Sequence, residues 1–375
     1  MLAIYLVTIL TISALYAPQP LLPVIVETFG VSNTSAASLT TISFIPLALA
    51  PLFYGPFLEK LGPLQVLRWG VLLLALSEIW FFFGEAFSTL MWLRLGQGLL
   101  IPALLTAAMT YLSVSAEREN VSRVMATYIA ATIVGGLLGR LFSGVLASLL
   151  GWRSSFLVLA VSLLVAFVML WPLVAPRREA SDQKVPLARL MPEVLKVGLF
   201  RRVYLMVFCF FFAFAAIMNF IPFRLYEVSG AADEWRVGLM YSGYLMGVVT
   251  ALLAVRIKSV FGSEKRVVLV GLSIYACALL MMLSSRIPVV FVAMFLFCGA
   301  MFLVHATATG WLNRLSTRHK GVVNGLYVAS YYGGGMLGSW LPGYAYQAWG
   351  WSSLVAILAV AIGVALTVGS TLVES

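Results

Sequence analysis

The chain has 375 residues, of which 62% are hydrophobic and 10% are charged. A soluble domain is about 45–50% apolar and about 25% charged, so this composition excludes a soluble enzyme, a nucleic-acid-binding domain and a disordered protein. A helix that crosses the bilayer needs about 20 mostly apolar residues, and the chain is long enough for twelve of them joined by short loops. Most of the net charge of +10 comes from basic residues in the loops on one side of the predicted membrane protein, as described below.

Charged residues and Gly/Pro turns divide the chain into twelve continuously apolar segments, which excludes the alternating pattern of a membrane β-barrel. The first segment has no basic region before it and no small-residue cleavage site, so we predict a membrane helix there and not a cleaved signal. The predicted fold class is an all-α membrane protein with twelve transmembrane helices. In chain order these cover residues 2–27, 34–58, 64–84, 87–112, 120–149, 153–175, 201–228, 236–258, 266–285, 287–313, 320–347 and 350–372.

The basic residues are distributed unevenly between the two sides of this arrangement. With the N-terminus in the cytoplasm, 18 Lys and Arg residues fall in or beside the inner loops and 4 in or beside the outer loops. Inner loops of membrane proteins carry such an excess. We therefore expect a multi-pass protein of the cytoplasmic (inner) membrane with both termini inside, and the net charge requires no nucleic acid.

The two halves of the chain are similar in sequence. When the chain is shifted by 199 residues, 13 of the 34 positions from 128 to 161 are identical to their counterparts, and the glycines coincide. Two halves with the same membrane orientation form a parallel repeat, which places a substrate site between them near the midplane and opens it alternately to each side. We expect an N-terminal six-helix bundle, residues 1–175, a polar cytoplasmic linker, residues 176–199, and a C-terminal six-helix bundle, residues 200–375.

Several motifs resemble those of the major facilitator superfamily, and the resemblance extends over essentially the whole chain. The loop after the second span has Glu59 where the superfamily usually has Asp, and Pro63 where a basic residue is usual. A second copy follows the eighth span, and the fourth span begins with an Arg-x-x-Gln-Gly motif. The resemblance implies that Glu59 and its partners latch an inner gate. The motif residues are Gly55, Glu59, Gly62, Arg256, Gly262, Arg94, Gln97 and Gly98.

The fifth span resembles one branch of this superfamily in particular. Its run from Gly135 to Arg140 resembles the drug:proton antiporters, which usually have Pro at the place of Arg140. Other residues make the chain similar to the YnfM-type inner-membrane transport proteins. The resemblance implies an efflux-type secondary transporter and no particular substrate, and it leaves open whether the native chain starts further upstream. The residues concerned are Tyr16 to Pro23, Asn219 to Leu225, His305, and Ser330-Tyr331-Tyr332.

Arg140 is the sharpest candidate for a functional charge, because it lies within the outer half of a predicted span. A charge at membrane depth costs about 2.5–3.5 kcal/mol on insertion scales and is usually functional. We expect Arg140 to bind an anion or to gate the central cavity. The alternatives are a structural pair with Glu27 or Glu78, and a side chain that extends to the outer interface.

The remaining substrate-binding candidates are polar side chains in the cavity-lining regions of the two halves. Aromatic side chains with a few polar groups are the usual lining of a small-molecule site, although they also form belts at membrane interfaces. Asn219 and Arg224 are near the outer end of their span, where they would line the outer gate or, for Arg224, lie among headgroups. The complete set of candidates is Tyr16, Gln19, Arg140, Asn219, Arg224, His305, Tyr331 and Tyr332.

Proton coupling has three candidates. The imidazole of His305 titrates near neutral pH, although a lone His is more often a hydrogen-bonded packing residue. Glu27 and Glu78 are the carboxylates at membrane depth, and the span of Glu78 is normally peripheral in this fold, so Glu27 is preferred. The resemblance assigns Arg94 to coupling, with an interfacial anchor as the alternative. Because no acid lies near the midplane, we expect an anionic or zwitterionic substrate.

Glycines and prolines mark the helices that are expected to move. Gly135, Gly136 and Gly139, with Gly144, let two helix backbones approach closely, either as plain packing or as a sliding contact between the two halves. Pro18, Pro20, Pro23 and Pro222 are expected to bend the first and seventh spans near their outer ends, which suits gates.

The sequence has no nucleotide-binding loop, metal-ligand cluster or nucleophile elbow, so we expect no enzyme activity, no cofactor and no metal. We predict a monomeric secondary active transporter that moves a small organic solute by alternating access, as proton-coupled efflux. Its partners would be the substrate, protons and the lipid bilayer. The alternatives are an exporter of lipophilic cations, an uptake or uniport carrier, and a non-transporting membrane sensor with the same fold.

Overall fold

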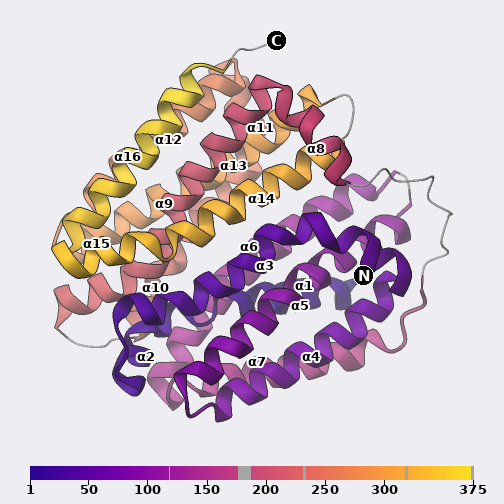
Figure 1. Cartoon of the computed structure of the whole chain (residues 1–375), viewed down its shortest axis with the longest axis horizontal. Coiled ribbons are helices and arrows are strands. Elements are labelled where there is room, and N and C mark those ends of the chain that lie inside the picture. Colours follow the sequence, from indigo (N-terminus) through magenta and orange to yellow (C-terminus); the bar gives the residue numbers. More distant parts are fainter. Residues whose placement is uncertain (118, 176–186, 231–233, 317–319, 373–375) are drawn as a thin grey trace.

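The computed structural model describes residues 1–117, 119–175, 187–230, 234–316 and 320–372, with side chains at all of these except 50–60, 122, 187–189, 234 and 320–321. Helices joined by turns make up this described part, which confirms the predicted all-α class. Figure 1 shows the N-terminal half, in indigo to magenta, beside the C-terminal half, in red to yellow. Between the halves, α3 packs against α14 and α6 packs against α10.

The helices of the N-terminal half follow the six predicted spans. The first span is divided at Pro18 and Pro20, because proline has no N–H group to continue the hydrogen bonds of the helix. The helices are α1 (Leu2–Tyr16), the 3₁₀ helix η1 (Gln19–Leu21), α2 (Leu22–Phe29), α3 (Asn33–Leu61), α4 (Pro63–Phe83), α5 (Phe87–Ser115), α6 (Val121–Leu150) and α7 (Ser154–Leu170).

The C-terminal half repeats this order after a short helix, α8 (Leu187–Lys196), that was not among the predicted elements. Its seventh span stays one helix through Pro222, whereas the eighth span is divided into three elements and the eleventh into two. The helices are α9 (Gly198–Ser229), α10 (Glu234–Met240), the 3₁₀ helix η2 (Tyr241–Gly243), α11 (Tyr244–Phe261), α12 (Glu264–Met281), α13 (Ile287–Leu315), α14 (Lys320–Gly338), α15 (Leu341–Trp349) and α16 (Trp351–Ser370).

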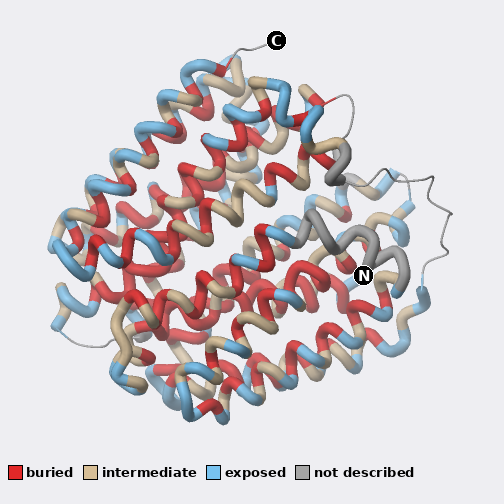
Figure 2. The backbone as a smooth tube through the Cα atoms, viewed as in Figure 1, coloured by how far each residue is buried: buried red, intermediate tan, exposed pale blue. Residues whose placement is uncertain are grey.

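The outer surface of the helices is apolar. Large hydrophobic side chains such as Trp80, Trp92 and Val255 are exposed, and the buried residues lie on the opposite faces, as Figure 2 shows. A soluble protein does not expose so large an apolar surface, but a protein surrounded by lipid does. By length and composition alone, eight helical segments of the described residues suffice to cross a membrane.

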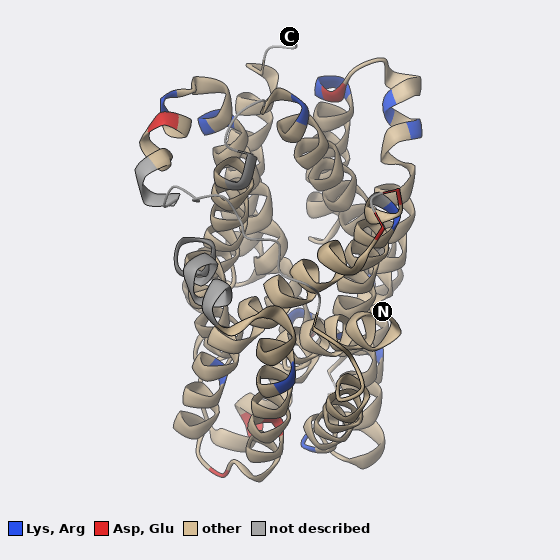
Figure 3. Ribbon diagram, turned by 90° about the vertical axis from the view of Figure 1, so that its right-hand side faces the viewer, with Lys and Arg blue, Asp and Glu red and all other residues tan. Residues whose placement is uncertain are grey.

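The helices alternate in direction, so the molecule has two distinct ends. We call the end with both chain termini, α8 and the turns at Gly62 and Gly262 the terminal face. The opposite end, with the turns at Gly30 and Gly350, is the distal face. Figure 3 shows how sparse the charged residues are along the helices.

The two halves repeat their internal contacts in the same register, which confirms the parallel repeat. In the N-terminal half, Gly139 faces Ser13, where an added Cβ would lie 2.6 Å from the Ser13 carbonyl oxygen. In the C-terminal half, Gly338 faces Phe212 in the same way, and each partner is shifted by the same 199 residues. The hydroxyl of Tyr5 donates to the carbonyl of Val124, and that of Tyr204 to Val323, again 199 residues later.

Candidate functional site

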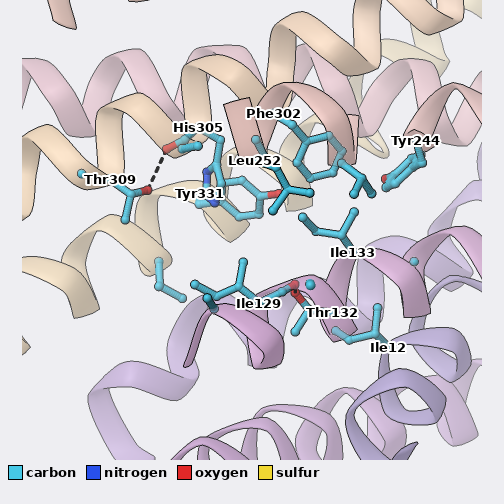
Figure 4. Close-up of a pocket in the computed structure, with 18 of the residues that line it drawn as sticks. Ile12, Ile129, Thr132, Ile133, Tyr244, Leu252, Phe302, His305, Thr309 and Tyr331 are labelled. Atoms are coloured by element: carbon cyan, nitrogen blue, oxygen red, sulfur yellow. Dashed lines mark hydrogen bonds between the residues drawn. The ribbon is translucent and has the colours of Figure 1, made fainter. Parts of the chain in front are cut away.

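A cavity of about 500 Å³ lies between the two halves. It is bordered by α1 and α6 of one half and by α11, α13 and α14 of the other, as the close-up in Figure 4 shows. From Tyr16 and Tyr244 in the middle of the molecule it extends toward the terminal face, where Ala126 and Asn313 line it. Its described lining has no Lys, Arg, Asp or Glu, and the polar side chains there are Tyr16, Thr132, Tyr244, His305, Thr309, Asn313, Tyr327, Tyr331 and Tyr332.

Aromatic rings from both halves close the cavity on its distal side. Phe44 of α3 lies 6.1 Å from Tyr16 and 6.0 Å from Tyr332, measured between ring centroids. Phe211 of α9 stacks on Tyr331 with centroids 3.5 Å apart. The predicted substrate residues Tyr16, Tyr331 and Tyr332 therefore lie together, as lining and as part of this aromatic layer.

Arg140 lies behind this lining and is only 1% exposed. Its Cζ is 3.8 Å from the ring centroid of Tyr16, 4.6 Å from Tyr244 and 5.4 Å from Tyr241. Its Nε donates to Gln19 Oε1 at 2.6 Å and its Nη1 donates to the Gly136 carbonyl at 2.7 Å. We call these five residues the Arg140 cage.

The Arg140 cage joins the two halves, because Tyr241 and Tyr244 come from η2 and α11 while the other members come from the N-terminal half. Within the described part of the chain no acidic side chain forms an ion pair with Arg140. This excludes the alternative of a pair with Glu27 or Glu78, and the burial of the guanidinium excludes the other alternative, a side chain that extends to the outer interface.

The glycines of α6 serve two kinds of contact. Gly135 and Gly139 pack against Ile9 and Ser13 of α1, within the same half, so for them the predicted sliding contact between the halves is wrong. Gly136 faces Arg140, Tyr244 and Tyr16. The close approach between the halves runs instead through Gly144 and Gly238 of α10, where an added Cβ on Gly238 would lie 3.4 Å from the Gly144 Cα.

Hydrogen bonds join the halves on the distal side of the cavity. Thr41 Oγ1 and Ser339 Oγ are 2.8 Å apart, and Asn219 Nδ2 donates to the carbonyls of Ala37, at 3.0 Å, and Ser339, at 2.8 Å. We call this set, with the pair Thr34 and Gln347 at 3.1 Å, the distal seam. Asn219 thus lies in a closed contact between the halves and not in the cavity lining.

Glu27 and Arg224 lie further toward the distal face. Glu27 Oε1 accepts a hydrogen bond of 2.7 Å from the Tyr226 hydroxyl, which adds an exposed contact between the halves. Arg224 forms an ion pair of 3.4 Å with Glu227 and also donates to Ser285. Neither lines the cavity, so the structure separates these two candidates from Tyr16, His305 and the Arg140 cage.

His305 lines the cavity and lies next to two tyrosines. Its Nδ1 is 2.9 Å from the Tyr327 hydroxyl, and its ring centroid is 4.9 Å from that of Tyr331. The imidazole is thus both a hydrogen-bonded packing residue and a cavity residue.

Arg94 is fully buried within the N-terminal half. Its guanidinium donates to the carbonyls of Ala14, Leu15 and Leu39 at 3.0, 2.6 and 3.1 Å, and to Gln97 Oε1 at 2.7 Å. Such complete burial excludes the predicted alternative of an interfacial anchor.

The structure describes the second copy of the loop motif more fully than the first. Gly55 and the side chain of Glu59 fall in the stretch 50–60, which lies outside the residues with described side chains, and Gly62 has a φ of +75° that favours glycine. In the second copy, Glu264 forms ion pairs with Lys258 of α11 and Arg314 of α13, which joins three helices at the terminal face. Arg256 is exposed nearby, and Gly262 ends α11 in the left-handed conformation.

Sequence comparison identifies the family. A model of the Major Facilitator Superfamily matches residues 4–257 and 231–374. The chain belongs to the Major Facilitator Superfamily. It is therefore a membrane transporter protein by family, and the predicted resemblance and fold are confirmed.

Curated members of the superfamily match nearly the whole chain. The inner membrane transport protein YnfM of Escherichia coli (strain K12) is 27% identical, covering 99% of this chain and 89% of its own. The uncharacterized MFS-type transporter YybF of Bacillus subtilis (strain 168) is 25% identical over 97% of this chain and 91% of its own.

Solved structures share the fold. The nucleoside transporter NupG superimposes with a TM-score of 0.81 at 11% identity, covering 99% of this chain and 98% of that chain. A bacterial homologue of the human lysosomal transporter Spinster, in an inward-facing and unoccupied conformation, gives a TM-score of 0.78 at 16% identity, covering 99% and 93%. At these identities the likeness concerns the fold alone.

Sequence reasoning missed several residues of the site. Tyr241 and Tyr244 of the Arg140 cage flank the glycine of a Tyr-x-Gly-Tyr run that divides the eighth span, and this run is the sequence signal that marks them. Phe44 gave no signal, because one aromatic residue in an apolar span is usual. Glu78 was set aside as peripheral, although its side chain is fully buried.

Proposed function

We propose that the protein exports small organic anions across the cytoplasmic membrane by alternating access, in exchange for protons. One observation supports this most directly: Arg140 is a buried cation behind Tyr16 and Tyr244, at the distal end of the cavity, and its described hydrogen-bond and ring partners are all neutral. Burial of an uncompensated charge is costly, and an anionic ligand would offset that cost.

The cavity lining supports an organic anion with an apolar or aromatic body. Its volume of about 500 Å³ is within the range of small-molecule sites, roughly 300–1,000 Å³. Aromatic rings and a few hydroxyls would hold the body of the ligand, while the guanidinium would bind a carboxylate in a bidentate manner. Tyr16 and Tyr244 lie between the cavity and Arg140, so the anion would have to displace them, one from each half.

The direction of transport rests on the orientation predicted from the basic residues. If the terminal face is cytoplasmic, the cavity extends toward the cytoplasm and the distal seam closes the outer side. A substrate would then enter from the cytoplasm and leave once the distal seam has opened. Monomers would suffice, because the cavity is formed by one chain.

Ligand binding tests the anion site. We expect small aromatic carboxylates to raise the melting temperature of the purified protein in detergent, since a ligand at 100 times its Kd stabilises the folded state by about 2.7 kcal/mol. Arg140→Gln should abolish this shift. Arg153→Gln is the matched control, because Arg153 also bonds a carbonyl and contacts a ring, Trp152, but lies away from the cavity.

Transport is then measured by counterflow of a stabilising anion in liposomes. Exchange of labelled anion by the wild type and not by Arg140→Gln is the expected result. Binding without exchange would support a sensor instead. Stabilisation by lipophilic cations alone, or an unchanged shift in Arg140→Gln, would contradict the anion site.

A further inference from the structure

Glu78 is a buried acid that the cavity does not use. Its side chain is fully buried in α4, whereas Trp80 and Phe83 on the same helix are exposed. Among the described residues it is the one acidic side chain that is buried. Its Oε1 accepts a hydrogen bond from Gln97 Nε2 at 3.0 Å, and its Oε2 is buried without a partner. An ionised carboxylate in this place is costly, so a neutral, protonated one is favoured.

One charged group faces Glu78 from the helices around it. These helices are α1, α3, α5 and α7, and the described residues of α3 and α7 have no titratable side chain. On α5, Arg94 is linked to Glu78 through Gln97, whose Oε1 accepts from Arg94 and whose Nε2 donates to Glu78. The other titratable groups are engaged elsewhere: Tyr5 with Val124, Tyr111 with Val174, Tyr16 with Arg140, and Arg68 of α4 with the end of α7.

Arg94 in turn binds the backbone at the end of α1, where the first span is interrupted. In a continuous helix the carbonyl of Ala14 would accept from the N–H of residue 18, but Pro18 has none. Arg94 Nη1 supplies that missing donor, and Nη2 binds the next carbonyl, that of Leu15. Two members of the Arg140 cage, Tyr16 and Gln19, come within the four residues after Leu15.

We propose that Glu78 carries the coupled proton and that its ionisation opens the Arg140 cage through Gln97 and Arg94. This inference rests on the proposed function. When Glu78 is protonated, Arg94 stays on the α1 carbonyls and the cage is closed, as in this structure. When the proton leaves the carboxyl oxygen, the negative charge attracts Arg94, which loosens α1 and frees Arg140 for the anion.

The sign of the coupling follows from this order of events. Anion binding favours ionised Glu78, so it should release one proton, and anion affinity should rise with pH by up to about tenfold per pH unit. Proton binding from the opposite side closes the cage and expels the anion, which is the sequence of an exchanger. No other group has to gain or lose a proton.

The test compares Glu78→Gln with the wild type. Proton release on anion binding is followed with a pH dye in weakly buffered detergent, and transport is followed as counterflow and as accumulation driven by a pH gradient. Because its substituted side chain is neutral at every pH, Glu78→Gln should bind the anion weakly, with the pH-independent affinity of the protonated wild type. It should show counterflow only at high anion concentration, release no proton and lose gradient-driven accumulation. Gln97→Leu, which keeps the carboxyl but breaks the bridge, should reduce the pH dependence and serves if Glu78→Gln does not fold.

The outcomes separate this inference from the proposed function. If the wild type binds no anion, the proposed function fails. If the wild type binds anions and the variants still release a proton and accumulate substrate, Glu78 is not the carrier although the proposed function stands. Proton uptake on anion binding would also overturn the inference. The control Glu85→Gln alters an exposed carboxyl in the turn between α4 and α5 and should behave as the wild type.

Discussion

At the scale of single residues, charges within apolar runs were predictable and their neutral partners were not. Arg140 and Arg94 stand out in the sequence because a charge in a span is rare. Tyr241 and Tyr244 resemble any other aromatic residue of a membrane helix, so only the fold shows that they face Arg140. The partners of a buried charge are set by which helices meet, and that information is spread over both halves.

The ring of Tyr244 should stabilise Arg140 as a cation–π partner. Desolvated contacts of this kind are worth about 2 kcal/mol. In a double-mutant cycle of Tyr244→Leu and Arg140→Met, measured by unfolding in detergent, we expect a coupling free energy of about 1–2 kcal/mol, and Tyr244→Phe should retain it. Purely additive losses would show that the ring only fills space.

At the scale of elements, the spans were predicted well because each apolar run is long enough for one helix. A bend of the first span at Pro18 and Pro20 was also expected, since proline removes backbone donors, and the span is divided there. α9 differs, because it continues through Pro222. The sequence predicts which side of α6 carries the glycines, because they recur at helical spacing. It does not predict which helix packs against that side.

The contact of α6 with α1 should tolerate no side chain at Gly139. An added Cβ would lie 2.6 Å from Ser13 backbone atoms, and backbone cannot move aside as a flexible side chain can. We expect Gly139→Ala to lower the free energy of unfolding by about 1–3 kcal/mol, as overpacking does elsewhere. Gly96→Ala, where a Cβ meets nothing within 4 Å, is the control and should remain close to the wild type. Equal stability of the two variants would contradict this close packing.

At the scale of the whole molecule, the parallel repeat was predictable and the state of the transporter was not. The glycine register at a shift of 199 residues showed two similar halves. The relative position of the two halves depends on contacts such as that of Thr41 with Ser339. These two residues are far apart in the chain, and no sequence pattern links them. Several states of a transporter share one sequence, so the sequence alone does not select the one with a closed distal seam.

Closing the distal seam covalently should stop transport. Thr41 Oγ1 and Ser339 Oγ are 2.8 Å apart, so sulfur atoms at these positions would be close enough to form a disulfide. In a protein whose native cysteines are replaced, Thr41→Cys with Ser339→Cys should lose counterflow on oxidation and regain it with a reducing agent. The single variants, which cannot crosslink, should be unaffected by either treatment. Undiminished exchange in the crosslinked protein would mean that the seam need not open.

The shared register of the two halves makes Ser339 the counterpart of Arg140, 199 residues later. Here one copy has become the charge enclosed by tyrosines, and the other has become a hydroxyl that fastens the halves together. Equivalent positions of the two halves thus serve different contacts: a buried charge in one half and a hydrogen bond between the halves in the other.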